Sequence, residues 1–130
     1  MYKYIFLDLD DTLWDFAKNS HETLEELFEL YNLNKIGITD CNDFIINYKI
    51  ENDKLWKLYR NNKITKDNLR ILRFQKTFSL YNIQDDSLAN KISMDYINIC
   101  PLKQNLMSGA IELLEYLKEK YSLTMVTNGF

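Results

Sequence analysis

The stretch Tyr4-Ile5-Phe6-Leu7-Asp8-Leu9-Asp10-Asp11-Thr12-Leu13 decides the fold of this chain. Its first four residues form a short apolar run that acidic residues stop, which is typical of a strand buried on both faces in a parallel sheet. A second run, Leu123–Val126, lies near the other end of the chain and is followed by Thr127-Asn128-Gly129. The sequence therefore predicts an α/β fold in which these two strands are parallel neighbours.

The residues between the two strands show helical periodicity. Apolar residues recur at spacings of three and four, and no buried strand pattern interrupts the stretch from Phe16 to Ile99. Residues that can cap the expected helices are Asn19 (with Glu22 in a capping box), Asp40 or Asn42, Thr65, Asp86 or Ser87, and Ser108 with Gly109. We expect residues 1–14 and 101–130 to form the sheet part and residues 15–100 to form a helical bundle. Two strands and one crossover helix bury their own faces poorly, so the sheet is expected to be incomplete in this chain.

Composition excludes several classes of function. The 130 residues are 46% hydrophobic and 27% charged, which fits a soluble globular protein. The N-terminal apolar run is too short for a signal peptide, so we expect a cytoplasmic protein. The net charge of −3 is spread along the chain, so neither nucleic acid nor a membrane is an expected partner. The two cysteines are far apart and form no CxxC pair, so a zinc or redox site is not expected.

Acidic and polar residues follow both expected strands. Asp8 and Asp10 are separated by one residue, so an extended backbone points their side chains to the same side. One carboxylate can hold a hard cation and attack phosphorus, while the other exchanges protons with the leaving oxygen and with water. Thr127 and Asn128 offer a hydroxyl and an amide to a phosphate oxygen. Each motif alone is also an ordinary turn or cap sequence, and it is their joint placement after two strands that favours a site.

These motifs resemble those of a known family. Asp8-Leu9-Asp10-Asp11-Thr12-Leu13 is similar to the first motif of the haloacid dehalogenase-like (HAD) hydrolase superfamily, and Val126-Thr127-Asn128-Gly129 is similar to its second. The helical insert matches the superfamily's cap in place and size. The segment Leu55–Phe74, read with Leu13-Trp14-Asp15-Phe16 and Thr127-Asn128-Gly129-Phe130, resembles the pyrimidine 5'-nucleotidase branch.

The resemblance implies a Rossmann-like HAD core, residues 1–14 and 101–130, with residues 15–100 as its helical cap. It implies an Mg2+-dependent phosphatase whose substrate is a small phosphate ester, with nucleoside monophosphates favoured. Asp8 would be the nucleophile that forms an aspartyl-phosphate, and Asp10 the acid and base. The Asp8 carboxylate and the Asp10 backbone carbonyl would hold Mg2+, and Thr127 and Asn128 would bind phosphate.

The chain departs from the family pattern in several places. Asn62 stands where the branch usually has glycine, and Ser108 where a proline often stands. The family's lysine and its second acidic pair have no matched residue in these 130 positions. We therefore expect the chain alone to be a poor phosphatase.

Three further interpretations stay open. Trp14 and Phe16 follow the first motif directly and could stack on a nucleobase, although such aromatic residues are more often core. A signalling receiver domain with a phospho-accepting aspartate also has an acidic cluster after its first strand, but its strands and helices alternate throughout. A non-catalytic HAD fragment that binds through exposed apolar surface is the third alternative.

Overall fold

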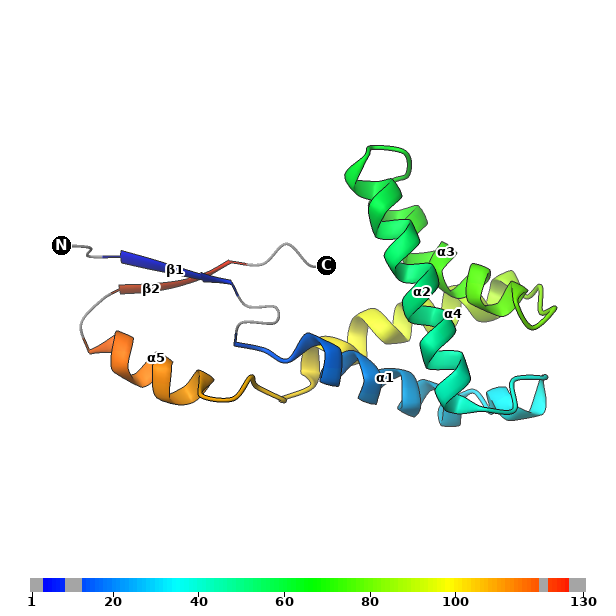
Figure 1. The fold of residues 1–130 in the computed structure, drawn as a ribbon. Helices are drawn as coiled ribbons and strands as arrows, with labels where there is room; N and C mark the ends of the chain where they lie inside the picture. The colour runs from blue at the N-terminus through cyan, green and yellow to red at the C-terminus, as the bar shows by residue number, and fades with distance from the viewer. Residues whose placement is uncertain (1–3, 9–12, 120–121, 127–130) are drawn as a thin grey trace. The chain divides into compact units, whose positions relative to one another are not determined.

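The computed structural model describes residues 4–8, 13–119 and 122–126, and Figure 1 shows its elements along the chain. In chain order these are β1 (Tyr4–Asp8), α1 (Phe16–Leu30), η1 (Leu33–Lys35), α2 (Cys41–Arg60), α3 (Lys66–Ser79), α4 (Asp86–Ile99), η2 (Cys100–Leu102), α5 (Ala110–Lys118) and β2 (Ser122–Val126). The chain divides into two compact units. The first unit is Met1–His21 with Cys100–Phe130, and the second unit is Glu22–Ile99.

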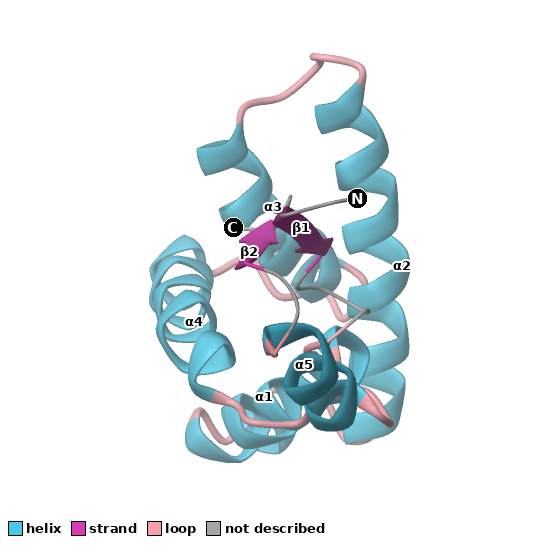
Figure 2. Ribbon diagram, turned by 90° about the vertical axis from the view of Figure 1, so that its left-hand side faces the viewer, coloured by secondary structure: helices cyan, strands magenta, loops and turns pink. Residues whose placement is uncertain are grey.

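The first unit contains a two-stranded parallel sheet. The register pairs Tyr4 with Ser122 at one end and Asp8 with Val126 at the other, so both strands end level at their carboxyl ends. Figure 2 shows the two strands in magenta. This pairing agrees with the parallel neighbours that the sequence predicts. A wider Rossmann-like sheet stays a prediction, because the described part of the chain holds these two strands only.

Every element between Phe16 and Ile99, a stretch that is described throughout, is a helix. Two of the expected caps are observed: the Asp40 carboxylate accepts hydrogen bonds from the backbone N–H groups of Asn42 and Asp43, and Thr65 Oγ1 accepts one from Asn68 N at 3.2 Å. For α4 the cap is one residue earlier than expected, since Asp85 Oδ1 accepts from Leu88 N at 3.0 Å.

The expected capping box of Asn19 and Glu22 is wrong. α1 begins at Phe16, and Asp15 caps it by accepting a hydrogen bond from Lys18 N at 3.1 Å. Asn19 lies inside the helix, where its own N–H donates to the backbone oxygen of Asp15. Aspartate is as good an N-cap as asparagine, so the earlier residue can start the helix and leave the Asn19 amide for other contacts.

The second unit has a core of aromatic and aliphatic side chains contributed by all four of its long helices. Tyr48 of α2 lies near Phe74 of α3 and Tyr96 of α4, with ring centroids 4.9 Å and 5.9 Å apart. The ring of Phe44 on α2 likewise lies near the ring of Phe28 on α1. The largest fully buried side chains of this unit are Tyr48, Phe44, Phe74, Phe78, Leu24, Leu27, Leu33, Ile38, Ile45, Leu69 and Ile92. Helices α2 and α3 pack together, as do α3 and α4.

Helix α5 packs against β2 in the first unit. It starts after Gly109, whose φ of +79° is a backbone conformation that glycine adopts without strain. None of the described helices combines the length and the apolar composition that crossing a membrane requires.

Candidate functional site

The carboxyl ends of β1 and β2 carry the two motifs that the sequence singles out. Asp8 is the last residue of β1 and pairs with Val126, the last residue of β2. Thr127 and Asn128 follow Val126 directly in the sequence, and Asp10 is two positions after Asp8. Asp10, Thr127, Asn128 and the side chain of Asp8 lie outside the described residues, so their grouping stays a prediction. The strand register itself ends both strands at one edge, where ligands of open parallel sheets bind.

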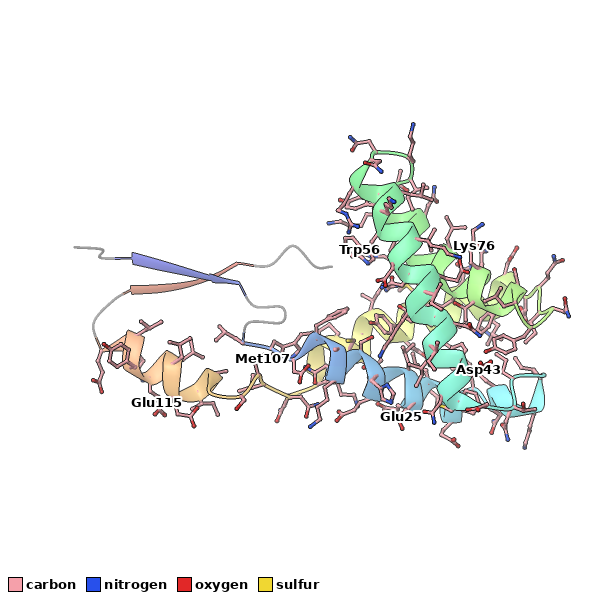
Figure 3. All side chains as sticks on the ribbon, viewed as in Figure 1. Glu25, Asp43, Trp56, Lys76, Met107 and Glu115 are labelled. Carbon is pink, nitrogen blue, oxygen red and sulfur yellow. The ribbon has the colours of Figure 1, made fainter. Side chains whose placement is uncertain are left out.

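The segment after the first motif is held by a short backbone ladder, which we call the linker ladder (residues 13–15 and 105–107). The backbone oxygen of Leu13 accepts a hydrogen bond from Met107 N at 2.7 Å, and Asp15 N donates to the backbone oxygen of Asn105 at 2.9 Å. Trp14 and Leu106 form an antiparallel bridge between them. Figure 3 labels Met107 on this segment. The ladder therefore joins the chain leaving the first motif to the chain returning toward the second.

A pair of asparagines, the buried Asn19 and the half-buried Asn105, extends the linker ladder. Asn19 is fully buried, and its Nδ2 donates to the backbone oxygen of Asn105 at 3.0 Å. Its Oδ1 accepts from both Asn105 N at 3.1 Å and Asn105 Nδ2 at 2.7 Å. Three hydrogen bonds between two side chains and one backbone segment fix the first turn of α1 against the returning chain. This pair is not predictable from the sequence, because two asparagines 86 positions apart give no local signal.

Trp14 and Phe16, the expected stacking residues, are both half-buried, and their ring centroids lie 6.1 Å apart. Trp14 also has a structural contact, since its Nε1 donates to the backbone oxygen of Lys103 at 2.8 Å. A tryptophan N–H that is removed from water needs such a partner. The contact orients the indole ring, and stacking of either ring on a base stays a prediction.

The residues expected to bind a metal offer oxygen donors. A carboxylate at Asp8 and a backbone carbonyl at Asp10 are the hard ligands that Mg2+ prefers, so the chemistry of this donor set fits the ion. Elsewhere, within residues 13–119, no group of three or more histidine, cysteine, aspartate or glutamate side chains is placed to hold a metal. Neither Cys41 nor Cys100 forms a disulfide in the described part of the chain, and burial with nearby Glu25 and Glu29 raises the pKa of the Cys41 thiol.

Two tyrosines of the second unit have strongly raised pKa values. Burial and a hydrogen bond from its hydroxyl to Asp95 raise the pKa of Tyr31 to about 12. Burial and the 2.7 Å hydrogen bond that its hydroxyl donates to Asp43 raise the pKa of Tyr81 to about 12. Both hydroxyls stay protonated near neutral pH, so they act as fixed donors that tie helices together, and Figure 3 labels Asp43 at the start of α2.

Comparison with known proteins gives a consistent result. The family model described as haloacid dehalogenase-like hydrolase matches residues 2–130. The chain is 30% identical over 128 residues to the HAD-hydrolase YfnB of Bacillus subtilis and 32% identical over 129 residues to the pyrimidine 5'-nucleotidase PynA of Streptococcus pneumoniae. It is 28% identical over 127 residues to the pyrimidine 5'-nucleotidase YjjG of Escherichia coli. Each match covers 98% of this chain and 52% of the relative.

A solved structure shows the same fold. The crystal structure of Bacillus subtilis YfnB bound to magnesium matches 99% of this chain and 55% of its own chain, with a TM-score of 0.84 and 29% sequence identity. The chain thus spans about half the length of the curated relatives it matches.

Proposed function

The chain belongs to the haloacid dehalogenase-like hydrolase family, and we propose that its protein hydrolyses phosphomonoesters through an aspartyl-phosphate on Asp8. The observation that carries this proposal is the parallel register of β1 and β2, which ends Asp8 and Val126 at one edge of the sheet. The two motifs that follow those residues in sequence supply a nucleophile, an acid and neutral phosphate ligands. That combination is suited to phosphoryl transfer and not to carbon–halogen chemistry.

In the first proposed step, a carboxylate oxygen of Asp8 attacks phosphorus and the phosphorus–oxygen ester bond breaks. The carboxylic acid of Asp10 gives its proton to the leaving oxygen, and the product alcohol departs. In the second step, the Asp10 carboxylate takes a proton from a water molecule whose oxygen attacks phosphorus. The acyl-phosphate bond then breaks, which releases inorganic phosphate and restores the carboxylate of Asp8 and the acid form of Asp10.

The Asp8 carboxylate and the Asp10 backbone carbonyl are the proposed Mg2+ ligands. When bound, the ion neutralises negative charge on the phosphoryl oxygens. The Thr127 hydroxyl and the Asn128 amide donate hydrogen bonds to the same oxygens and hold the phosphate in line with Asp8.

We propose pyrimidine nucleoside 5'-monophosphates as substrates. Two relatives at 32% and 28% identity, PynA and YjjG, are pyrimidine 5'-nucleotidases. Both match the entire cap segment Leu55–Phe74, because their matches span 98% of this chain. We also propose that these 130 residues alone give little activity, since the family's lysine and second acidic pair have no matched residue here. Loss of one such electrostatic contact costs on the order of a hundredfold or more in rate.

The experiment is a phosphate-release assay on UMP with and without Mg2+, using the protein that carries the complete family fold and the 130-residue chain in parallel. Asp8→Asn should lower turnover by on the order of a thousandfold or more and should abolish the phosphorylated form seen by mass spectrometry after acid quenching. Full turnover by Asp8→Asn would refute the nucleophile.

Asp10→Asn tests the proton transfer separately. It should slow UMP hydrolysis by roughly a hundredfold or more. It should slow hydrolysis of p-nitrophenyl phosphate much less, because that leaving group departs without a proton. Equal losses on the two substrates would argue against Asp10 as the acid.

A further inference from the structure

The cations of this chain are concentrated in one segment of the second unit. Residues 54–76 contain eight of the sixteen lysines and arginines but only one of the nineteen acidic residues. The segment comprises the end of α2, the turn that follows it and most of α3. The even spread of charge, on which the expectation of no nucleic-acid partner rests, therefore does not hold here.

Five of these cations lie where α2 turns into α3, and we call them the basic tip. They are Lys57, Arg60, Lys63, Lys66 and Arg70. The first four are exposed, and Arg70 is half-buried with its Nη1 at 3.7 Å from a carboxylate oxygen of Asp67. Figures 1 and 2 show the turn projecting beyond α4, and Figure 3 shows nitrogen atoms gathered around it near Trp56. A ligand can therefore reach the basic tip from solvent.

Hydrogen bonds fix the backbone of this turn. Lys63 N donates to the backbone oxygen of Leu58 at 2.9 Å, and Asn62 N donates to that of Tyr59 at 3.0 Å. Asn62 has a φ of +56°, a left-handed conformation that asparagine tolerates. This is the Schellman pattern of helix ends. The basic side chains thus stand on an ordered frame, so binding costs little ordering of the backbone.

Support of the helix ends explains only a part of this charge. Lys57 and Arg60 lie in the last turn of α2, where cations offset the negative end of the helix dipole. Lys63 and Lys66 lie at the start of α3, where the dipole is positive and cations are unfavourable. Within the described residues, Lys57, Arg60 and Lys63 form no ion pair. An anionic partner would relieve the repulsion among these like charges.

Two aromatic rings lie beside the basic tip. Trp56 and Tyr59 of α2 form an edge-to-face pair whose ring centroids are 5.6 Å apart and whose planes meet at 88°. Both residues are half-buried, whereas Phe44 and Phe74 in the core of the same unit are fully buried. Trp56 stands one helical turn before Arg60, so the two lie on neighbouring positions of the helix surface. Exposed ring surface beside cations is the combination that stacks on bases while the cations contact phosphates.

The opposite end of α2 carries the opposite charge. Asp40 and Asp43 begin the helix, and Glu25 and Glu29 of α1 lie close enough to raise the pKa of Cys41. Figure 3 labels Glu25 and Asp43 at this end, away from Trp56. A helix of this length spans about 30 Å, which is well beyond the Debye length of about 8 Å at physiological salt. The acidic end therefore does not cancel the field of the basic tip.

We propose that the basic tip binds single-stranded nucleic acid: its cations contact the phosphates, and Trp56 stacks on a base. The inference uses no residue of the candidate site and does not depend on the proposed nucleotidase function. A single strand fits because its bases are free to reach a ring, whereas a duplex keeps them stacked inside. An acidic protein surface would leave the rings unused. A second copy of this chain fits poorly, since the end of a two-helix turn offers less area than the roughly 1,200–2,000 Å² that stable interfaces bury.

The first test titrates the 130-residue chain into a labelled oligothymidylate of about twelve nucleotides and follows fluorescence anisotropy. Binding should weaken with salt, and the slope of log K against log salt should be about −2 to −3, as expected for three or four phosphates. A duplex of equal length should bind more weakly, and polyglutamate should displace the strand poorly. Absence of binding at low salt, equal binding of the duplex, or efficient displacement by polyglutamate would each overturn the proposal.

The second test separates the basic tip from net charge. Lys57→Gln, Arg60→Gln and Lys63→Gln together should weaken binding by roughly tenfold or more and make the salt slope shallower by about 2. The matched control combines Lys35→Gln, Lys49→Gln and Lys91→Gln, which changes three exposed lysines elsewhere in the second unit. It alters the net charge equally and should leave affinity and slope nearly as they are. Equal weakening in the two triple variants would show that only net charge matters and would overturn the proposal.

The third test concerns the aromatic ring. Trp56→Leu should weaken binding by roughly tenfold and leave the salt slope unchanged, while Trp56→Phe keeps a ring and should retain most of the affinity. Full binding by Trp56→Leu would refute stacking. Asp8→Asn should bind the strand normally, and loss of binding in that variant would place the strand at the candidate site and overturn the proposal. Absence of phosphate release by the unsubstituted protein would refute the proposed function alone, because strand binding is measured without hydrolysis.

Discussion

The interactions that stabilise each of the two units differ in kind. In the second unit, α2, α3 and α4 bury Phe44, Tyr48, Phe74 and other large side chains almost completely. In helix α5 of the first unit, Ala110 is buried whereas Ile111 and Tyr116 are more than half exposed, and outside this helix the described apolar residues Leu13 and Cys100 are also buried. The first unit also contains the paired strands β1 and β2, and the hydrogen bonds of the linker ladder and of the Asn19–Asn105 pair join its two chain segments.

This difference separates the interactions that stabilise the fold from those that fix its local geometry. Buried apolar area provides the larger stabilisation, so the helical unit should carry most of the unfolding free energy. Each hydrogen bond contributes less, but hydrogen bonds fix geometry, and a buried donor or acceptor that loses its partner is costly. We therefore expect substitutions in the second unit to act mainly through cavities and those in the linker ladder through unsatisfied polar groups.

The largest expected effect is a cavity in the second unit. Phe74→Ala removes a fully buried ring that lies near Tyr48, Phe78 and Tyr96, and it should lower the free energy of unfolding by about 3–5 kcal/mol. Urea unfolding followed by circular dichroism measures the change. The matched substitution in the first unit, Ile111→Ala at a position 54% exposed, should change it by about 0.5 kcal/mol or less. Similar losses at the two positions would break the comparison.

The next effect concerns the asparagine pair. Asn19→Ala leaves the N–H and side-chain amide of Asn105 without their acceptor, and it should cost about 1–3 kcal/mol. A double-mutant cycle with Asn105→Ala should give a coupling energy of about 0.5–3 kcal/mol. If the two losses simply add, the pair does not act as a unit and the linker ladder depends on its backbone bonds alone.

A smaller effect is expected at the start of α3. Thr65→Ala removes the hydroxyl that accepts from Asn68 N, and it should lower the free energy of unfolding by about 1 kcal/mol. Thr65→Ser keeps the hydroxyl and serves as the control. A loss in the serine variant as large as in the alanine variant would assign the effect to the methyl group and not to the cap.

The smallest effect appears only at high pH. The pKa of Tyr31 and of Tyr81 is raised to about 12 in the folded chain, against about 10 for an exposed tyrosine. Folding therefore favours the protonated phenols, and the stability they add is complete below about pH 10 and is lost as the pH rises toward about 12. The urea midpoint at pH 11 relative to pH 8 should fall less in Tyr31→Phe and Tyr81→Phe than in the unsubstituted chain. An unchanged pH dependence in both variants would contradict this account.

Local patterns predicted much of the fold. Apolar runs stopped by polar residues located both strands to within one residue, because the polar residues also end the strands. Asp40 and Thr65 were found as caps because capping is a contact between near neighbours. The start of α1 was misplaced because Asp15 and Asn19 both suit an N-cap, and the competing contact of Asn19 lies 86 positions away.

The candidate site was predicted from residue types in two short motifs. The register ends the two strands that precede these motifs at one edge, and the grouping of the motif side chains stays a prediction. Outside the candidate site, Arg73 of α3 is buried with its guanidinium beside the Tyr96 ring, and it was missed although a signal exists. It stands four residues after Leu69 and four before Thr77, on the stripe that α3 buries. A cation on an apolar stripe could have marked it. The rings around it come from α2, α3 and α4, and that grouping depends on tertiary packing. The helical run from Phe16 to Ile99 also disfavours a receiver domain, whose strands alternate with helices.

The linker ladder also makes the intervening segment a closed loop whose two ends meet. Asp15 and Asn105 are joined by a backbone hydrogen bond, so the chain between them, which includes the whole second unit, begins and ends at one place. Closing a loop of twice the length costs only about 0.6 kcal/mol more. The ladder is thus an insertion point. There, evolution or protein engineering can replace one insert by another of different size while the strands on either side keep their register.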